Sequence, residues 1–301
     1  MARVGIIGLG WVGASVAAAV LQRGLAQELL LHDVRGEIAE GEALDFAHGA
    51  LLYPRARVRA APLSDFTTLD AVVVSAGRGG KPDESRLALL RDNLAVAESL
   101  GQALRGFAGV IIAVSNPVDI FTEVLRRAAE LPAERVIGTG TTLDSARLRF
   151  ELGEQLGVHP HSVHAQVLGE HGDSELVNWS AAQAGGRTLR DWRGWNEELE
   201  AEIAARVRGA AYEIIRRKGA TNQAIGLVTA SVLAAVLHNE DRVLTVSRLQ
   251  QGVAGVDGVP LSLPAVVGRD GATRVLEPRL DAAEAEALAR SAAIIAERLP
   301  S

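Results

Sequence analysis

The sequence of 301 residues contains no cysteine. Disulfide bonds, thiolate nucleophiles and cysteine-ligated metals are therefore excluded, and we expect no metal site. The sequence also lacks any apolar run long enough to span a bilayer, and its first apolar segment has neither the basic flank nor the cleavage site of a signal peptide. These absences favour a cytoplasmic location and a protein that does not bind membranes.

Blocks of like charge are missing as well. The net charge is −6 and the isoelectric point is near 5.7, with both signs scattered along the chain. Nucleic acids and anionic membranes are bound by basic surfaces, so neither is expected as a partner. The sequence does contain 48% hydrophobic and 23% charged residues, which is the balance of a well-packed globular protein. Neither a Pro/Ser-rich linker nor an internal repeat interrupts it.

The first half of the chain alternates short apolar runs with helical segments. The apolar runs predict β-strands at 3–8, 28–33, 70–77 and 109–117. Helices are expected at about 10–24, 36–50 and 85–105. This alternation predicts an α/β Rossmann fold with a doubly wound parallel sheet, in which ligands lie at the carboxyl ends of the strands.

The second half of the chain has a mixed pattern. Its predicted helices are at about 142–157, 196–218 and 281–298. Its predicted strands are two alternating segments and a strand-rich stretch, at about 162–169, 176–190 and 243–267. We therefore expect an NAD-binding Rossmann domain over 1–140 and an α+β catalytic domain over 141–301.

Three glycines follow the first predicted strand. Gly8, Gly10 and Gly13 form the pattern G-x-G-x-x-G at a strand-to-helix turn, where backbone N–H groups and the helix dipole hold a pyrophosphate. Asp33 ends the next strand, where a carboxylate binds a ribose diol and repels the extra phosphate of NADP. NAD is therefore the expected cofactor, and nearby Arg35 leaves NADP as the alternative. A purely structural glycine turn is the other interpretation.

Charged residues in later segments form a candidate catalytic set. His171 lies between glycines in GEHGDSE (169–175), a setting that exposes an imidazole, although an ordinary packed or surface histidine has the same appearance. Asp144 and Arg147 share one face of a predicted helix, as a simple local ion pair also would. Arg86 follows a glycine-rich loop beyond a strand end, where ligand-closing loops occur. Asn116 ends another strand on the same side.

Seven segments, spread in order along essentially the whole chain, match one family. They are IIGLGWVG (6–13), SAGRGGKPDESR (75–86), SNPVD (115–119), GTTLDSARLR (140–149), LGEHGDSE (168–175), YEIIRRKGAT (212–221) and LSLPAVVG (261–268). Together they resemble the L-lactate and malate dehydrogenases, and bacterial L-lactate dehydrogenase most closely. The resemblance implies an NAD-dependent oxidoreductase that interconverts an L-2-hydroxy acid, foremost L-lactate, and its 2-keto acid, pyruvate.

The resemblance also implies roles for individual residues. His171 matches the acid/base, Asp144 its partner carboxylate and Arg147 the clamp for the substrate carboxylate. Arg86 matches the arginine of the closing loop, and Asn116 matches a residue that contacts both the substrate and the nicotinamide. The positions that match cofactor contacts are Gly8, Gly10, Val12, Gly13, Asp33, Ala76, Gly77 and Asn116.

The reaction explains these residue types. Reduction of a 2-keto acid delivers a hydride to the carbonyl carbon and a proton to its oxygen, so a group that titrates near neutral pH belongs at that oxygen. A buried Asp144 orients the ring of His171 and favours its protonated form. Arg147 offers a planar fork that fits a carboxylate, which lysine lacks. Arg86 would polarise the carbonyl once water is expelled.

Gly80 leaves the substrate open. In this family the residue six positions before the loop arginine is glutamine in lactate enzymes and arginine in malate enzymes. Gly80 supplies no counter-charge for a second carboxylate and leaves room for bulkier 2-keto acids. Thr221 resembles the residue typical of lactate enzymes and favours pyruvate. Malate dehydrogenase stays as the alternative, because Arg78 or Lys81 could supply the missing charge.

Arg149 and His164 match positions at which bacterial lactate dehydrogenases bind fructose 1,6-bisphosphate between subunits. The resemblance therefore implies a homo-oligomer, a tetramer or a dimer, with this bisphosphate as a candidate allosteric effector. Ordinary surface or core roles for both residues are equally compatible. An NAD-dependent glycosidase is disfavoured because that chemistry uses Cys/His metal ligands. A catalytically inactive NAD-binding subunit is disfavoured because all the charged residues of the candidate catalytic set are present.

Overall fold

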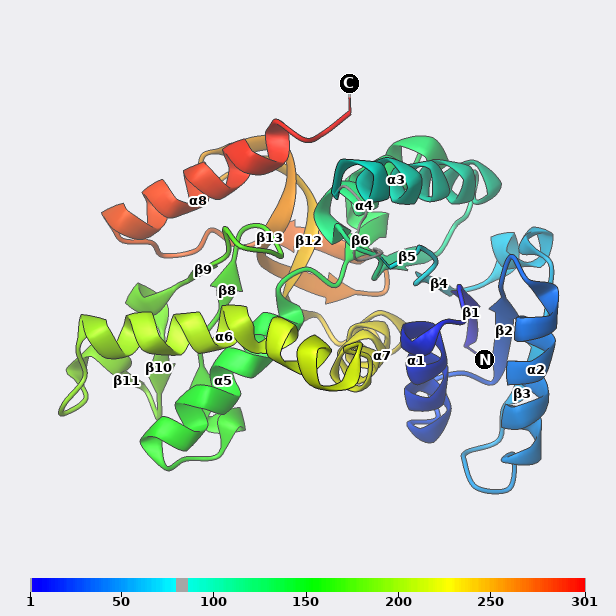
Figure 1. The fold of residues 1–301 in the computed structure, drawn as a ribbon, viewed down its shortest axis with the longest axis horizontal. Coiled ribbons are helices and arrows are strands. Elements are labelled where there is room, and N and C mark those ends of the chain that lie inside the picture. The colour runs from blue at the N-terminus through cyan, green and yellow to red at the C-terminus, as the bar shows by residue number, and fades with distance from the viewer. Residues whose placement is uncertain (1, 80–85, 301) are drawn as a thin grey trace.

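The computed structural model describes residues 2–79 and 86–300. Within them, nine strands form one sheet in the order β14-β13-β12-β6-β5-β4-β1-β2-β3 (Figure 1). Six of these strands are parallel, namely β1 (Arg3–Ile7), β2 (Glu28–His32), β3 (Arg57–Ala60), β4 (Ala71–Val74), β5 (Val110–Ala113) and β6 (Val136–Gly138). The predicted doubly wound Rossmann sheet is thus confirmed.

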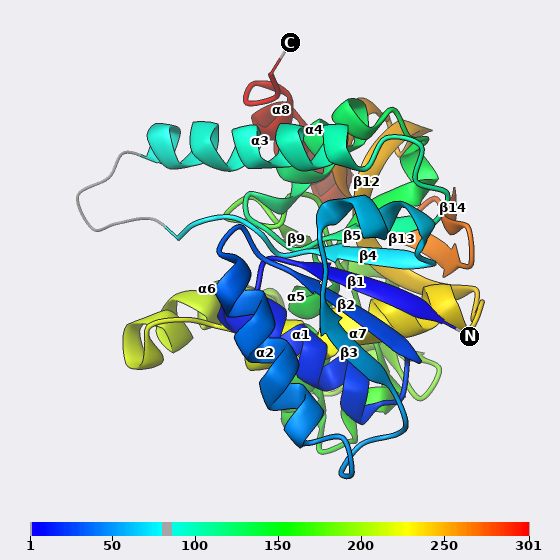
Figure 2. The ribbon, with the colours of Figure 1, turned by 90° about the vertical axis from the view of Figure 1, so that its right-hand side faces the viewer.

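Helices cover both faces of the parallel strands (Figure 2). On one face lie α1 (Trp11–Gln22), α2 (Gly36–His48) and α7 (Gln223–Leu237); on the other lie α3 (Arg86–Ala103) and α4 (Val118–Ala129). Each face has its own apolar core, with Val20 and Leu233 in the first and Leu100 and Phe121 in the second. Burial from both sides explains why the strands of the first half are almost wholly apolar.

The second half contains three further helices, α5 (Thr142–Leu156), α6 (Glu197–Lys218) and α8 (Ala282–Ala296). Short strands accompany them, namely β7 (Val163–His164), β8 (Val167–Leu168), β9 (Leu176–Val177), β10 (Gln183–Ala184) and β11 (Arg187–Thr188). Short 3-10 helices occur in both halves of the chain, at Leu63–Thr68 and Ala133–Arg135 in the first and at Pro160–Ser162, Trp179–Ala181 and Leu189–Asp191 in the second. This mixture of helices and short antiparallel strands is the expected α+β architecture.

Three long strands of the second half extend the sheet of the first. They are β12 (Arg242–Val253), β13 (Val256–Gly268) and β14 (Gly271–Val275), all antiparallel to their neighbours. Strand β12 joins β6 where Ser247 pairs with Gly138. The sequence predicts β12 and β13 but not β14, which lies beyond the predicted stretch at 243–267. It does not predict the partner of β12 either, because strand pairing between distant segments leaves no local signal. One sheet therefore crosses the expected boundary at residue 140.

Several elements differ from the sequence-based expectation. The sequence gives no prediction for β3, β6, α4 or α7. In α4 the buried face includes Asp119, Thr122 and Glu123, so its hydrophobic period is broken. Strands β4 and β5 end at Val74 and Ala113, earlier than predicted, because the chain then leaves the sheet to form the edge of the site. Within the described ranges, no helix has the length and apolar character needed to cross a membrane.

Candidate active site

The glycine turn lies at the carboxyl end of β1, between β2 and β4, where the strand order reverses. A Cβ on Gly13 would stand 1.9 Å from the carbonyl oxygen of Gly8, and one on Gly8 would stand 2.5 Å from the backbone of Ala76. A Cβ on Gly10 would have no neighbour within 4 Å. The turn thus needs glycine at two positions for its own packing and leaves open space at the third, where a pyrophosphate can approach.

Asp33 is fixed beside this turn. One carboxylate oxygen accepts a hydrogen bond from the N–H of Leu9 at 2.8 Å, and the other accepts one from the N–H of Arg35 at 3.0 Å. The guanidinium of Arg35 is 66% exposed and lies 3.9 Å from the carboxylate. A carboxylate oxygen has further lone pairs, so Asp33 can still accept hydrogen bonds from a ribose diol. The residues present therefore fit NAD.

The segments that follow β4 and β5 form the next wall of the site. The hydroxyl of Ser115 donates to the carbonyl of Ala76 at 2.5 Å, and the buried amide of Asn93 donates to the carbonyl of Asn116 at 3.0 Å. The peptide between Asn116 and Pro117 is cis, and the side chain of Asn116 is exposed. Asn93, which the sequence analysis missed, thus ties α3 to the strand end that carries Asn116.

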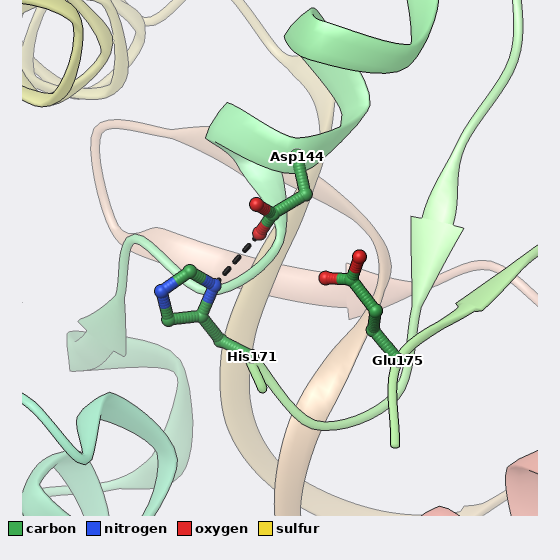
Figure 3. Close-up of side chains that lie close together, drawn as sticks. All are labelled: Asp144, His171 and Glu175. Atoms are coloured by element: carbon green, nitrogen blue, oxygen red, sulfur yellow. Dashed lines mark hydrogen bonds and ion pairs between the residues drawn. The ribbon is translucent and has the colours of Figure 1, made fainter. Parts of the chain in front are cut away.

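Asp144 connects two other residues of the predicted charged set, Arg147 and His171. It lies in the first turn of α5, which begins directly after β6. One of its oxygens accepts from Nη1 of Arg147 at 2.8 Å, and the other lies 2.7 Å from Nδ1 of His171 (Figure 3). Since Nδ1 of His171 is engaged by Asp144, Nε2 is the ring nitrogen left to meet a substrate.

The electrostatics of this group favour a protonated imidazole. Burial alone lowers the pKa of His171, but the hydrogen bond and charge of Asp144 raise it to about 9, with Asp119 and Glu175 adding to the effect. Burial alone raises the pKa of Asp144, but His171 and Arg147 hold it below its usual range. The pair is therefore an imidazolium and a carboxylate over the neutral pH range.

Two acidic residues of the site were missed by the sequence analysis, although both lie inside motifs that it identified. Asp119 is buried at the start of α4 and accepts a hydrogen bond from the backbone N–H of His171 at 2.8 Å. Burial raises its pKa to about 6. Glu175 is buried beside Asp144 and His171. Asp119 lies shortly after Asn116 in SNPVD, and Glu175 lies shortly after His171 in GEHGDSE. Nothing in the local sequence pattern indicates that either carboxyl is buried.

Asp144, His171 and Glu175 form the one cluster of metal-binding type found among the described residues. Their ligand atoms all lie within 4.8 Å of one another. Both oxygens of Asp144 already have partners, one in the guanidinium of Arg147 and one in the imidazole of His171. A metal ion bound there would compete with these two cationic partners for Asp144. The expectation that the protein holds no metal stays a prediction.

Some predicted site residues lie outside the described residues or apart from the charged set. Gly80 and Lys81 are outside them, and for Arg86 the backbone at the start of α3 is described but the side chain is not. The guanidinium of Arg78 pairs with Asp92 at 2.7 Å. Thr221 is half-buried in the connection between α6 and α7.

Arg149 and His164 line one cavity of about 340 Å³, together with Gln166 and Asn178. His164 is exposed, whereas Nε of Arg149 is buried and has no hydrogen-bond partner among the described residues. Burial lowers the pKa of Arg149. A buried guanidinium nitrogen without a partner suits an anion, because an unsatisfied cationic donor is costly to bury.

Two family descriptions match adjacent parts of this chain. The lactate/malate dehydrogenase NAD binding domain matches residues 2–138, and the lactate/malate dehydrogenase alpha/beta C-terminal domain matches residues 141–300. Among curated proteins, an L-lactate dehydrogenase of Geobacillus kaustophilus is 43% identical over 300 residues, covering 97% of this chain and 95% of the relative. One from a Synechococcus species is 43% identical over 299 residues, covering 98% of each chain.

Solved structures give the same result. The minor L-lactate dehydrogenase of Enterococcus mundtii, in a ligand-bound form, superposes with a TM-score of 0.96 at 36% identity, covering 98% of this chain and 96% of the other. A lactate dehydrogenase from a deep-sea metagenome library of the Medee basin superposes with a TM-score of 0.95 at 37% identity, covering 98% and 97%.

Proposed function

The chain belongs to the lactate/malate dehydrogenase family, and we propose that it is an NAD-dependent L-lactate dehydrogenase. The family membership confirms the resemblance expected from the sequence, and NAD is the cofactor. The observation that carries the reaction is the contact of Asp144 with both His171 and Arg147, which brings an acid/base and a carboxylate-binding group together. Residues 1–140 then hold the cofactor, and residues 141–301 supply the proton chemistry.

His171 performs the proton step. When bound, the nicotinamide exchanges a hydride with C2 of the substrate. In pyruvate reduction Nε2 of the imidazolium donates its proton to the carbonyl oxygen, and in lactate oxidation the neutral ring accepts the hydroxyl proton. Asp144 holds Nδ1 protonated and stabilises the positive charge, so Nε2 is the nitrogen that changes its protonation state.

Arg147 and Asn116 orient the substrate in this proposal. The guanidinium of Arg147 is already fixed by Asp144, so the rest of its donor fork can bind the substrate carboxylate with little further ordering. The exposed amide of Asn116 lies at the end of β5, on the edge of the sheet where the substrate and the nicotinamide meet. Arg86 is assigned the polarisation of the carbonyl by family resemblance alone.

The preference for pyruvate over oxaloacetate rests on charge. A second substrate carboxylate needs a cation, and Arg78 is a cation of the loop segment whose side chain the structure describes. Its guanidinium is paired with Asp92 on α3, which supports the monocarboxylate assignment. Malate dehydrogenase activity, or a broad activity on bulkier 2-hydroxy acids, remains the second candidate, because glycine at position 80 supplies neither of the side chains typical of the two branches.

Allosteric activation and assembly are further parts of the proposal. The cavity that holds Arg149 and His164 supports binding of fructose 1,6-bisphosphate, because an unpartnered buried guanidinium nitrogen suits a phosphate. Large exposed apolar side chains on and after α2 and on α6 support a homotetramer or homodimer; they are Leu44, Leu51, Leu52, Tyr212 and Ile215. The cytoplasmic location expected from the sequence stays a prediction.

Substrate selectivity is tested by parallel rates of NADH oxidation with pyruvate, 2-ketoisocaproate and oxaloacetate, each with and without fructose 1,6-bisphosphate. We expect the highest kcat/KM with pyruvate, and a lower KM for pyruvate when the bisphosphate is present. A preference for oxaloacetate would reject the lactate assignment. An unchanged saturation curve and an unchanged molecular mass by light scattering with the bisphosphate would reject the allosteric part alone.

A further inference from the structure

Glu175 places a third carboxyl group against the catalytic pair. It lies directly before β9, its residue is 7% exposed, and its carboxyl points toward Asp144 and His171 (Figure 3). Its ligand atom lies within 4.8 Å of those of both residues. Within the described residues, nothing donates a hydrogen bond to its carboxylate oxygens. The groups that act on this carboxyl are therefore the charges around it, those of the catalytic pair among them.

Charged groups surround this carboxyl on every side. His171 and Asp144 face it from the catalytic loop and from α5, and Arg147 is one helical turn beyond Asp144. On α6, Arg208 donates a hydrogen bond to the backbone carbonyl of Glu175 at 3.2 Å. On the other side, a cavity of about 480 Å³ separates Glu175 from further charged residues, which are Arg190, Asp281, Glu284 and Arg290.

The ionisation of Glu175 and that of His171 are coupled. Burial and the nearby charge of Asp144 raise the pKa of Glu175 to about 8, whereas His171, Arg208 and Arg147 oppose this rise. Two groups that interact affect each other equally, so an ionised Glu175 raises the pKa of His171 by the same interaction. Glu175 is therefore charged at the alkaline pH values at which His171 would otherwise lose its proton.

We propose that Glu175 is a positioning residue that keeps the proton on His171, and thereby extends keto-acid reduction to higher pH. The inference rests on the proposed function, in which His171 is the acid of the reductive direction. The charge of Glu175 has the opposite effect on lactate oxidation, which needs the neutral imidazole. Glu175 thus moves the pH range of both directions upward, without touching the substrate.

The variant Glu175→Gln tests this proposal, because it keeps the shape of the side chain and removes its charge. The matched control is Glu170→Gln. Glu170 is also close to His171 in sequence, but its carboxylate is bound by Arg298 at 3.1 Å and is not among the groups with the largest effect on the pKa of His171. The measurement is the pH dependence of kcat/KM for pyruvate and for lactate.

In Glu175→Gln the alkaline limb for pyruvate reduction should move down by on the order of one pH unit, and the acid limb for lactate oxidation should move in the same direction. The plateau kcat/KM should rise for reduction and fall for oxidation, by about tenfold taken together, because the pKa falls by about one unit while the equilibrium constant of the reaction is fixed. Glu170→Gln should leave both limbs in place. Unchanged limbs in Glu175→Gln, or equal shifts in both variants, would overturn the proposal, since a purely structural role lowers the rates in both directions without moving the limbs.

A titration of His171 by NMR separates this inference from the proposed function. In protein with labelled histidines, the signal missing from His171→Asn identifies the residue, and its pKa is read without any substrate. A lower pKa in Glu175→Gln than in the wild type supports the inference even if the substrate assignment fails; an equal pKa overturns it. If Glu175→Gln does not fold, Glu175→Asp replaces it, and a smaller shift in the same direction is expected.

Discussion

Nδ1 of His171 lies 2.7 Å from the Oδ2 atom of Asp144, although the two residues are 27 positions apart in the chain. The other oxygen of the same carboxylate holds Arg147. Asp144 thus fixes both the group that moves the proton and the group that binds the substrate. Its position between them explains why burial of this carboxylate is tolerated, since each oxygen has a cationic partner.

The variant Asp144→Asn should lower kcat/KM for pyruvate by about 10²–10⁴-fold. An amide fits the same space, but it does not stabilise the imidazolium and does not hold Nδ1 in its protonated form. The measurement is steady-state NADH oxidation, with the dissociation constant of NADH by fluorescence as the control. That constant should not change, because Asp33 and the glycine turn lie at other strand ends. Normal turnover in this variant would contradict the assigned role of Asp144.

The variant Arg147→Lys should lower kcat/KM for pyruvate about 10–100-fold, mainly by raising KM. Lysine keeps the positive charge but cannot bind a carboxylate through two parallel N–H groups. The control is Arg206→Lys, which changes an arginine that is 39% exposed and paired with Glu151 on the surface of α5. The control should have wild-type kinetics. Equal effects of both changes would show that the fork of Arg147 is not used for substrate.

The pKa of His171, raised to about 9, determines the pH range of the reaction. Pyruvate reduction uses the protonated ring, so its kcat/KM should be level through neutral pH and fall as the pH rises through about 9. The same raised pKa stabilises the folded protein below the ordinary value of 6.5, and this contribution should disappear as the pH rises through 9. Rate profiles and urea unfolding at several pH values measure the two effects; a rate that falls already near pH 6.5 would contradict the first.

Two neighbouring glycines should respond differently to alanine. In Gly13→Ala the added Cβ would collide with the carbonyl of Gly8 at 1.9 Å, so the free energy of unfolding should fall by about 1–3 kcal/mol. In Gly10→Ala the Cβ has no neighbour within 4 Å, so stability should be unchanged while NADH binding weakens about tenfold or more. Urea unfolding and NADH fluorescence distinguish the two. Equal stability losses would mean that the turn is not built as described.

The sequence predicts the architecture of the first half well because each of its strands and helices has a local pattern. It predicts the second half less completely. Helix α7 is apolar on all sides and has no period by which to tell it from a strand, and α4 buries an aspartate, a threonine and a glutamate. The antiparallel strands β12 and β13 are recognisable as strands, but their attachment beside β6 depends on tertiary pairing.

In the candidate site, too, residues within local motifs are predicted, whereas contacts that depend on tertiary packing are not. Motifs predict Asp144, Arg147 and His171, and helical spacing brings the first two together. The contact of His171 with Asp144 is long-range, and the family resemblance supplies it rather than the spacing. Asp119 and Glu175 were not predicted, because an acidic residue in a loop or a first helical turn is usually exposed. Only packing of α4 and β9 around the catalytic loop buries them.

The most direct test of the account is the conversion of pyruvate to L-lactate by the purified protein and by His171→Asn. We expect the wild type to consume one NADH for each L-lactate formed, with the enantiomer identified by chiral chromatography. His171→Asn should bind NADH as well as the wild type and lose about 10²–10⁴-fold in kcat/KM. An inactive wild-type protein, or His171→Asn with undiminished turnover, would contradict the proposed function and the role of His171 at its centre.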